Sequence, residues 1–84
     1  QAGVIMRRMA VLKAAGCLDE VPVLPPERCH PLKGNRKEEY AVDLKHPYRL
    51  VFRVVADALP RKADGGIDLK QIRAIQISGV EDYH

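Results

Sequence analysis

The sequence predicts an α+β domain in which a small antiparallel β-sheet carries helical structure on one face. Apolar residues recur at helical spacing over Ala2 to Ala15. Two segments that alternate between apolar and polar residues, Glu39 to Leu44 and Tyr48 to Val55, follow one another across a three-residue turn. The 84 residues suffice for one domain, residues 1–84, near the lower limit for a self-sufficient hydrophobic core.

The composition is that of an ordinary globular protein. Hydrophobic residues make up 46% and charged residues 30%, which is too apolar for a disordered chain. No apolar run approaches a membrane span, and no signal peptide is visible. Cys17 and Cys29 do not make a secreted disulfide framework, so we expect reduced thiols and a cytoplasmic protein. The net charge of +3 is compatible with an anionic partner.

The N-terminal helix is expected over Ala2 to Ala15. Ile5, Met9 and Leu12 follow the i, i+4, i+7 spacing of a buried stripe. The chain opens on Gln1 and enters the helix at once, so we expect that a natural N-terminal portion is absent from this sequence.

A connector and a short strand follow the helix. Cys17 to Glu27 contains three prolines, which lack the backbone donors that regular elements need. Arg28 to Leu32 is predicted to be a short strand, and Pro31 places it at an edge or a bulge. Lys33 to Lys37 is predicted to be a basic turn.

The two central strands are expected to share one apolar face, which a helix covers, and to carry arginines on the other face. The apolar face is formed by Tyr40, Val42, Leu44, Tyr48, Leu50, Phe52 and Val54. Asp57 to Gln71 is too long for a hairpin loop, and is either a flexible insertion or contains a single helical turn. Arg73 to Gly79 is the last predicted strand, with Ile75 and Ile77 facing the core.

The C-terminal tail combines three side chains that suit acid–base chemistry on RNA. The His84 imidazole can both take and give a proton near neutral pH. Asp82 has the same strand parity, so its carboxylate can orient that imidazole or share the role of general base. Tyr83 can stack on a nucleobase. A frayed tail, a solvated aspartate and a tyrosine folded back onto the sheet are the structural alternatives for these residues.

A second group lies near the middle of the chain. His30 is a second proton carrier and Lys33 supplies a mobile positive charge, a pair that suits phosphodiester cleavage. A purely structural histidine beside Pro31 is the alternative. The basic turn also carries Arg36 and Lys37, which are candidate substrate-binding residues.

Arg49 and Arg53 lie on one face of a predicted strand, where two guanidinium groups can hold a phosphate through bidentate hydrogen bonds. A cross-strand ion pair with a residue such as Asp43 is the structural alternative. No metal site is expected, because Cys and His residues show neither Cys-x-x-Cys nor paired-histidine spacing.

Three separated motifs resemble the HigB branch of the RelE/ParE toxin superfamily: His30 to Lys37, Tyr48 to Phe52, and Glu81 to His84. The helix over Ala2 to Ala15 is similar to the second helix of that family. The resemblance implies a RelE-like sheet with helices on one face, from which the family's first strand and first helix are missing here.

The resemblance also implies a function, that of a toxin in a type II toxin–antitoxin system. Such toxins are ribosome-dependent mRNA endonucleases that inhibit translation without a metal or cofactor. The partners would be a cognate HigA-like helix-turn-helix antitoxin and mRNA in the ribosomal A site. His30 and His84 would be the acid and base with Asp82 assisting, Lys33 and Arg49 would stabilise the phosphate, and Tyr83 would position a base. The alternative is a catalytically inactive module that docks an antitoxin or nucleic acid.

Overall fold

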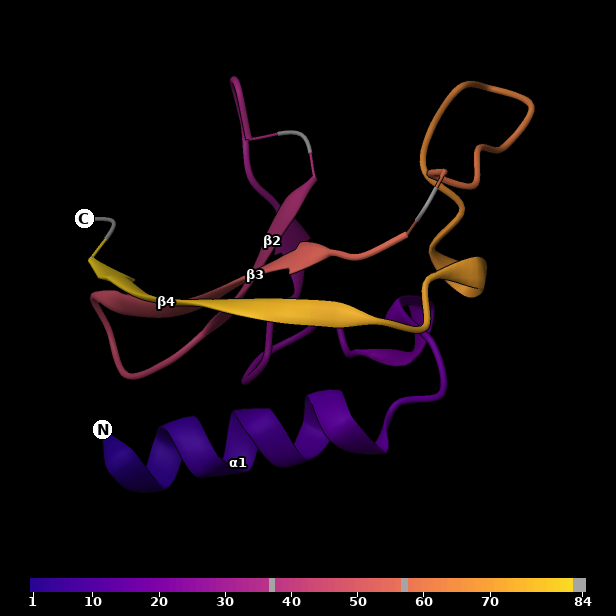
Figure 1. The fold of residues 1–84 in the computed structure, drawn as a ribbon. Coiled ribbons are helices and arrows are strands. Elements are labelled where there is room, and N and C mark those ends of the chain that lie inside the picture. Colours follow the sequence, from indigo (N-terminus) through magenta and orange to yellow (C-terminus); the bar gives the residue numbers. More distant parts are fainter. Residues whose placement is uncertain (37, 57, 83–84) are drawn as a thin grey trace.

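The computed structural model, which describes residues 1–36, 38–56 and 58–82, consists of one helix packed beneath one antiparallel sheet (Figure 1). In chain order the elements are α1 (Ala2–Ala14), the 3-10 turn η1 (Leu18–Glu20), β1 (His30–Pro31), β2 (Glu39–Asp43), β3 (Tyr48–Val54), the 3-10 turn η2 (Leu69–Gln71) and β4 (Ile75–Asp82). This arrangement confirms the predicted α+β class with an antiparallel sheet. The described part of the chain contains no helix with the length and hydropathy that a membrane span requires.

The sheet follows the order of the sequence, β1-β2-β3-β4, and every neighbouring pair is antiparallel. The strand predicted over Arg28 to Leu32 contributes only the two residues of β1, although the N–H of Leu32 still donates to the carbonyl of Glu39 at 3.0 Å. The last strand starts later than predicted and runs past Gly79 as far as Asp82. The C-terminal residues Glu81 and Asp82 therefore belong to the sheet.

The main core lies between the sheet and α1, and the alternation of β2 and β3 predicts it well. Its buried members are Leu18, Val21, Tyr40, Val42, Leu44, Leu50, Phe52, Val54 and Ile72. Phe52 is fully buried, and its ring stacks on that of Tyr40 with 6.2 Å between the ring centroids. Among the strand residues predicted to face the core, Tyr48 at the start of β3 and Ile77 of β4 are instead exposed.

Helix α1 packs on this core through a face that differs from the predicted stripe. Ile5 and Leu12 contact the core as predicted, but the Met9 side chain is 41% exposed. Arg8 is half-buried instead, because its Nε donates to the carbonyl of Asp43 at 2.7 Å. The packed face of α1 is therefore centred nearer to Arg8, and Met9 lies toward the open side of the sheet.

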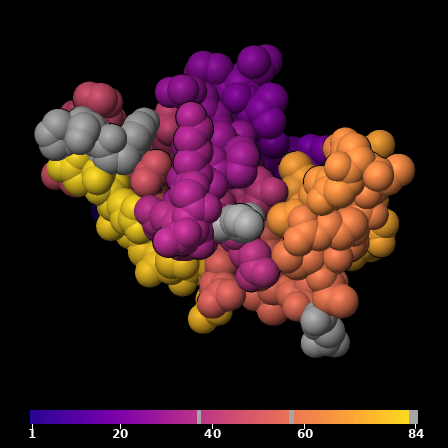
Figure 2. Space-filling view, turned by 90° about the horizontal axis from the view of Figure 1, so that it is seen from above, coloured from indigo at the N-terminus to yellow at the C-terminus, as the bar shows by residue number. Residues whose placement is uncertain are grey.

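A smaller cluster covers the opposite face of the sheet. Leu32, which follows β1, packs on Ala41 of β2 and Val51 of β3, and all three are buried. Figure 2 looks onto this face, where the magenta segment that contains β1 and the following turn lies between the yellow β4 and the orange connection. The turn is therefore fixed at its base over the middle of the sheet.

The long connection before β4 contains a single helical turn, one of the two predicted alternatives. Asp68 caps η2, and its side chain accepts from the backbone N–H of Lys70. Ile72, directly after η2, is 2% exposed and its carbonyl accepts from the N–H of Leu18 at 2.9 Å. This hydrogen bond joins the two 3-10 turns at one end of the core.

Strand β4 contains a bulge, which sets the direction of its last residues. Phe52 pairs with Ile77 and Val51 pairs with Gly79, so Ser78 is an extra residue on β4. Gly79 has a φ of +150°, which residues with a β-carbon rarely adopt. Beyond the bulge, Glu81 lies opposite Arg49, on the face away from α1.

Candidate functional site

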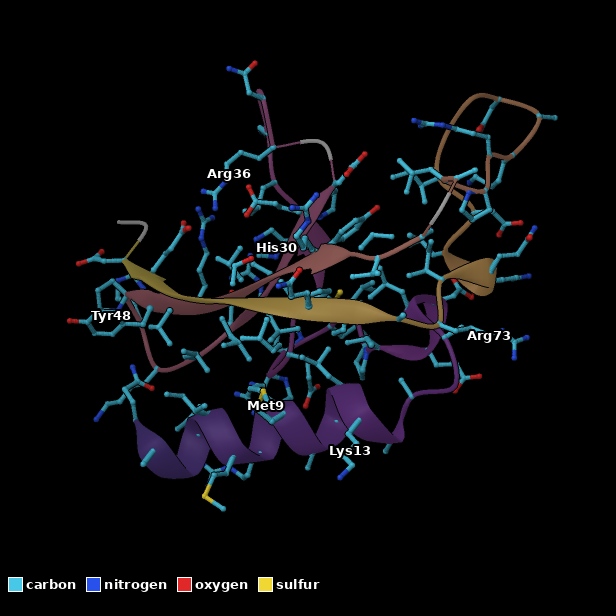
Figure 3. The ribbon with its side chains drawn as sticks, viewed as in Figure 1. Met9, Lys13, His30, Arg36, Tyr48 and Arg73 are labelled. Carbon is cyan, nitrogen blue, oxygen red and sulfur yellow. The ribbon has the colours of Figure 1, made fainter. Side chains whose placement is uncertain are left out.

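Four of the predicted site residues line one open hollow of about 410 Å³ on the face of the sheet away from α1. They are His30 of β1, Lys33 and Arg36 of the turn that follows, and Arg49 of β3, and Pro31 and Leu32 complete the lining. Figure 3 shows His30 and Arg36 on this side of the sheet, whereas Met9 and Lys13 lie on α1 below it. Residues from separate segments of the chain thus come together as a basic, imidazole-bearing surface.

The His30 ring is held by a hydrogen bond to the backbone. Its Nδ1 lies 2.6 Å from the carbonyl oxygen of Arg28, which can only accept, so Nδ1 is the donor. In the neutral imidazole this leaves Nε2 as the acceptor. His30 therefore has the tautomer that a general base needs, with Nε2 available to take a proton.

Arg36 is the centre of an ion-pair network at the edge of the hollow. Its guanidinium donates to both carboxylate oxygens of Glu81, at 2.9 and 2.6 Å, and to both oxygens of Glu39, at 2.8 and 3.2 Å. Arg49 donates to Glu81 at 3.3 Å. Two arginines and two carboxylates thus form a continuous network across β2, β3 and β4.

The network shifts the protonation equilibria of its members. The hydrogen bonds that Arg36 donates to Glu81, and then those to Glu39, raise the pKa of its guanidinium, which stays charged at any relevant pH. In return, the hydrogen bonds from Arg36 hold the pKa of Glu39 and of Glu81 below the usual carboxyl range. Both carboxylates are therefore ionised at neutral pH, and they offset part of the positive charge around the hollow.

Arg53 lies on the same face as Arg49, as predicted, but it lines a different hollow. It contacts Glu38 at 3.5 Å, and with Asn35, Arg36, Glu39 and Ser78 these residues surround a polar hollow of about 420 Å³. The side chain of Arg36 lines both hollows. Arg49 and Arg53 therefore line separate hollows, although their side chains lie on the same face of β3.

The sequence suggested Asp43 as a cross-strand partner for one of these arginines, and the β2–β3 ladder places Asp43 directly opposite Arg49. The ion pairs of these residues involve further partners. Asp43 contacts Arg28 at 3.0 Å, while Glu81 and Glu38 contact Arg49 and Arg53. Glu81 is the functional neighbour that sequence reasoning missed. Strict alternation places Glu81 on the face of Ile75 and Ile77, and only the bulge at Ser78 moves it to the arginine face.

The tail residues are only partly described. Asp82 lies opposite Tyr48 in the ladder, so its side chain leaves the sheet on the α1 side, away from Arg49. The predicted site residues Lys37, Tyr83 and His84 lie outside the described residues. The described contacts thus join the tail to the hollow through Glu81.

Neither thiol lies in this site. Cys17 and Cys29 are free and half-buried, and burial raises the pKa of the Cys29 thiol to about 11. Cys29 is therefore a neutral thiol at physiological pH, poorly suited to act as a nucleophile or a metal ligand. Within the described ranges, the His, Cys, Asp and Glu residues form no group of three or more that could hold a metal ion.

Comparison with protein-family models, with curated proteins and with solved structures finds no match to this chain. The resemblance to the RelE/ParE toxins therefore depends on the three sequence motifs alone.

Proposed function

We propose that this protein is a metal-independent endoribonuclease of the RelE/HigB type, a toxin that cleaves translated mRNA in the ribosomal A site. The observation that carries the proposal is the convergence of His30, Lys33 and Arg49 on one open hollow. An imidazole with Nε2 as acceptor, next to two cations, suits attack by an RNA 2′-hydroxyl on its own phosphate. A cytoplasmic location and regulation by a HigA-like antitoxin belong to the same proposal.

The chemistry assigns a separate task to each group. Nε2 of His30 takes the proton of the 2′-hydroxyl as the bond from O2′ to phosphorus forms. Lys33 and Arg49 neutralise the charge that builds up on the phosphorane oxygens. A second acid protonates O5′ as the bond from phosphorus to O5′ breaks, leaving a 2′,3′-cyclic phosphate. The motif assigns this acid to His84, with Asp82 assisting and Tyr83 positioning a base.

The network around Arg36 has a supporting role in this mechanism. Glu81 contacts both Arg36 and Arg49, and so fixes the direction of the guanidinium that faces the phosphate. A fixed donor needs little reorganisation when charge develops in the transition state. Glu81 thus acts as a positioning residue, and Arg36 connects it to Glu39.

Cleavage mapping by primer extension in a reconstituted translation reaction tests the proposal. His30→Ala removes the proposed base and is expected to lower the cleavage rate about 100-fold or more. Lys33→Ala is expected to lower it as well, whereas Lys62→Ala, which removes an exposed lysine in the connection before β4, is the matched control. Absence of cleavage by the folded protein, or equal rates for His30→Ala and the control, would contradict the proposal.

The charge balance of the site favours one alternative, a catalytically inactive module that docks an antitoxin or nucleic acid. Arg36 and Arg49 already contact carboxylates, and Asp82 projects from the other face. A binding module would bind its partner tightly and leave both translated mRNA and cell growth unaffected when it is produced. The same primer-extension experiment, combined with a growth assay, separates the two functions.

A further inference from the structure

The polar hollow of about 420 Å³ lies next to the proposed nuclease site, on the same face of the sheet. Arg36 lines both hollows, so an RNA strand with a phosphate in the first can place a neighbouring nucleotide in the second. Glu39 and Arg53, which line the polar hollow, pair across β2 and β3, the two inner strands of the sheet. A strand added at the outer edge of β4, or a helix added beside α1, would leave this face open.

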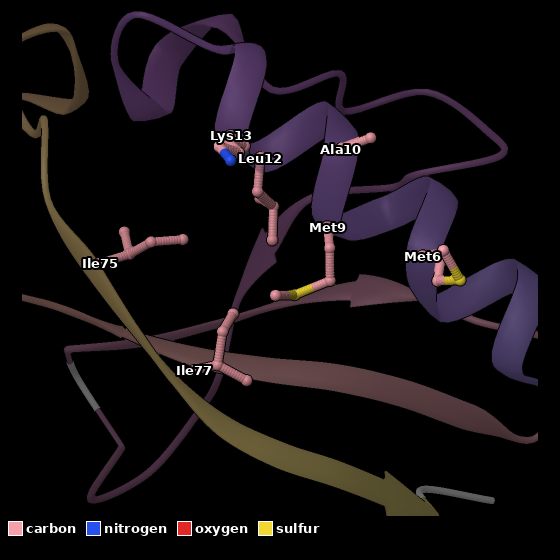
Figure 4. A pocket seen from close by; sticks show the side chains of 7 residues that line it. All are labelled: Met6, Met9, Ala10, Leu12, Lys13, Ile75 and Ile77. Atoms are coloured by element: carbon pink, nitrogen blue, oxygen red, sulfur yellow. The ribbon is translucent and has the colours of Figure 1, made fainter.

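The walls of the polar hollow carry hydrogen-bond donors and acceptors. The groove between α1 and β4 on the opposite face is different, as Figure 4 shows, because there Met9 faces Ile77 across an apolar surface. The polar hollow instead has guanidinium, carboxylate, amide and hydroxyl groups, contributed by Arg36, Arg53, Glu38, Glu39, Asn35 and Ser78. Such groups can hydrogen-bond to the edge of a nucleobase.

Glu38 and Arg53 are the pair in this hollow best placed to bind a ligand. Oε2 of Glu38 and Nη2 of Arg53 lie 3.5 Å apart, longer than the about 2.7–2.9 Å of a strong charge-assisted hydrogen bond. Their side chains are 45% and 54% exposed. The backbone holds both residues, because Arg53 lies within β3 and the carbonyl of Glu38 accepts from the N–H of Val54 at 2.9 Å. A carboxylate and a guanidinium are thus held side by side and open to solvent.

Arg36 provides a flat surface for the same hollow. Its hydrogen bonds to Glu39 and Glu81 involve Nε and both Nη atoms, and such bonds lie in the plane of the guanidinium. The two faces of that plane take no part in them. Unpaired bases of RNA stack on guanidinium planes, and the four hydrogen bonds hold this one in a fixed orientation.

We propose that the polar hollow binds guanine in single-stranded RNA, an inference that rests on the proposed function. Guanine presents two donors, N1–H and N2–H, next to two acceptors, O6 and N7, so a carboxylate and a guanidinium side by side match it. Glu38 accepts from N1–H and N2–H, and Arg53 donates to O6 and N7, as arginine does in duplex DNA. Adenine and cytosine offer one amino group to the carboxylate, and the N3–H of uracil lies between two acceptors. Guanine therefore makes the most hydrogen bonds.

Fluorescence anisotropy with 2′-O-methylated oligouridylates that carry one test nucleotide measures this recognition, because these strands bind without being cleaved. The full chain is expected to bind the strand with guanosine at least about fivefold more tightly than the strand with inosine, which lacks the N2 amino group. The same margin is expected over 7-deazaguanosine, in which carbon replaces N7. Strands with adenosine, cytidine or uridine at that position are also expected to bind more weakly.

Two conservative variants test the two contacts separately. Glu38→Gln puts an NH2 group against the donors of guanine, and is expected to abolish the preference over inosine while the preference over 7-deazaguanosine remains. Arg53→Lys keeps the charge but loses the planar fork, and is expected to have the opposite effect. Glu20→Gln, at an exposed carboxylate outside both hollows, is the matched control and is expected to keep both preferences. A ratio of affinities isolates the base contact, because removing a carboxylate strengthens binding to every strand alike.

Equal affinity of the wild type for the guanosine and inosine strands overturns the inference, as does tighter binding of another base or no measurable binding to any strand. Retention of both preferences by Glu38→Gln and Arg53→Lys overturns it too, and circular dichroism checks that each variant is folded. The proposed nuclease function fails separately, in the cleavage assay. A protein that prefers guanine but cuts no mRNA keeps this site and loses that function, and one that cuts without this preference does the reverse.

Discussion

Replacing Glu81 by Gln is expected to strengthen the binding of single-stranded RNA and to make it more sensitive to salt. Lys33, Arg36 and Arg49 are three cations around the hollow, and Glu39 and Glu81 are the two carboxylates that contact these arginines. With a neutral His30 the net formal charge of this group is therefore +1, and Glu81→Gln raises it to +2. The glutamine keeps an oxygen that can accept from Arg36, so the arginines retain a hydrogen-bond partner.

The size of the effect follows from the release of counterions. Each additional phosphate that a protein neutralises on a single strand steepens the plot of log K against log salt by about 0.7. Between about 50 and 200 mM salt, a fourfold increase, one extra neutralised phosphate corresponds to a further loss of affinity of roughly 2.6-fold. The variant is thus expected to bind more tightly than the wild type at low salt, with a difference that shrinks as salt is added.

Fluorescence anisotropy with a 2′-O-methylated oligonucleotide, which cannot undergo the cleavage reaction, measures this binding. Asp64→Asn is the control because it makes the same change in net charge at a side chain that is 71% exposed in the loop before η2. The asparagine also keeps the oxygen that accepts from the N–H of Gly66. Equal salt slopes for the two variants would show that the hollow is not where RNA binds. Weaker binding by Glu81→Gln would show that the carboxylate matters more as a support for Arg49 than as a competing charge.

Three further predictions concern folding. Arg36 lowers the pKa of Glu39 and of Glu81 below the ordinary value of 4.5. The contribution of these carboxylates to stability is therefore present above that pH and is lost as the pH falls through their lower folded-state pKa values. Urea unfolding should show that Glu81→Gln loses less free energy of unfolding on acidification than the wild type does. Ile72→Val is expected to lower the free energy of unfolding by about 0.5–1.5 kcal/mol and Ile72→Ala by about 2–5 kcal/mol, and no loss in either would mean that Ile72 is not part of the core. Gly79→Ala is expected to cost more than about 1 kcal/mol in the same assay, because its φ of +150° strains a residue with a β-carbon although that atom meets nothing within 4 Å; an unchanged midpoint would contradict this explanation.

The central strands were predictable because each alternates without interruption. Tyr40, Val42, Leu50, Phe52 and Val54 have side chains on one face by simple parity, and all of them are buried in the main core. The resemblance implies that His30, Lys33 and Arg49 act on one phosphate, and these three side chains line one hollow, but the implied partner His84 lies outside the described residues.

Other features depend on contacts that local patterns do not contain. Met9 fits the helical stripe, but the position of α1 under the sheet leaves Arg8 half-buried and Met9 41% exposed. Ile72 lies in a connection with no periodicity, and it is buried because η2 packs beside Leu18. The ion pair between Arg49 and Glu81 depends on the register of a strand that is distant in sequence, so it could not be chosen from spacing alone, whereas Asp43 lies opposite Arg49 on the neighbouring strand as spacing suggested.

The bulge in β4 has a consequence for comparing this chain with any relative. Before Ser78 the odd-numbered residues of β4 face α1, and after it the even-numbered residues do. A homologue without the extra residue would keep its counterpart of Glu81 opposite the arginine of the neighbouring strand. An alignment would therefore need a one-residue gap at Ser78, and a gap placed elsewhere in the strand would match Glu81 with a residue of the wrong face. The position of one gap thus decides whether an acidic residue in a relative is equivalent to Glu81.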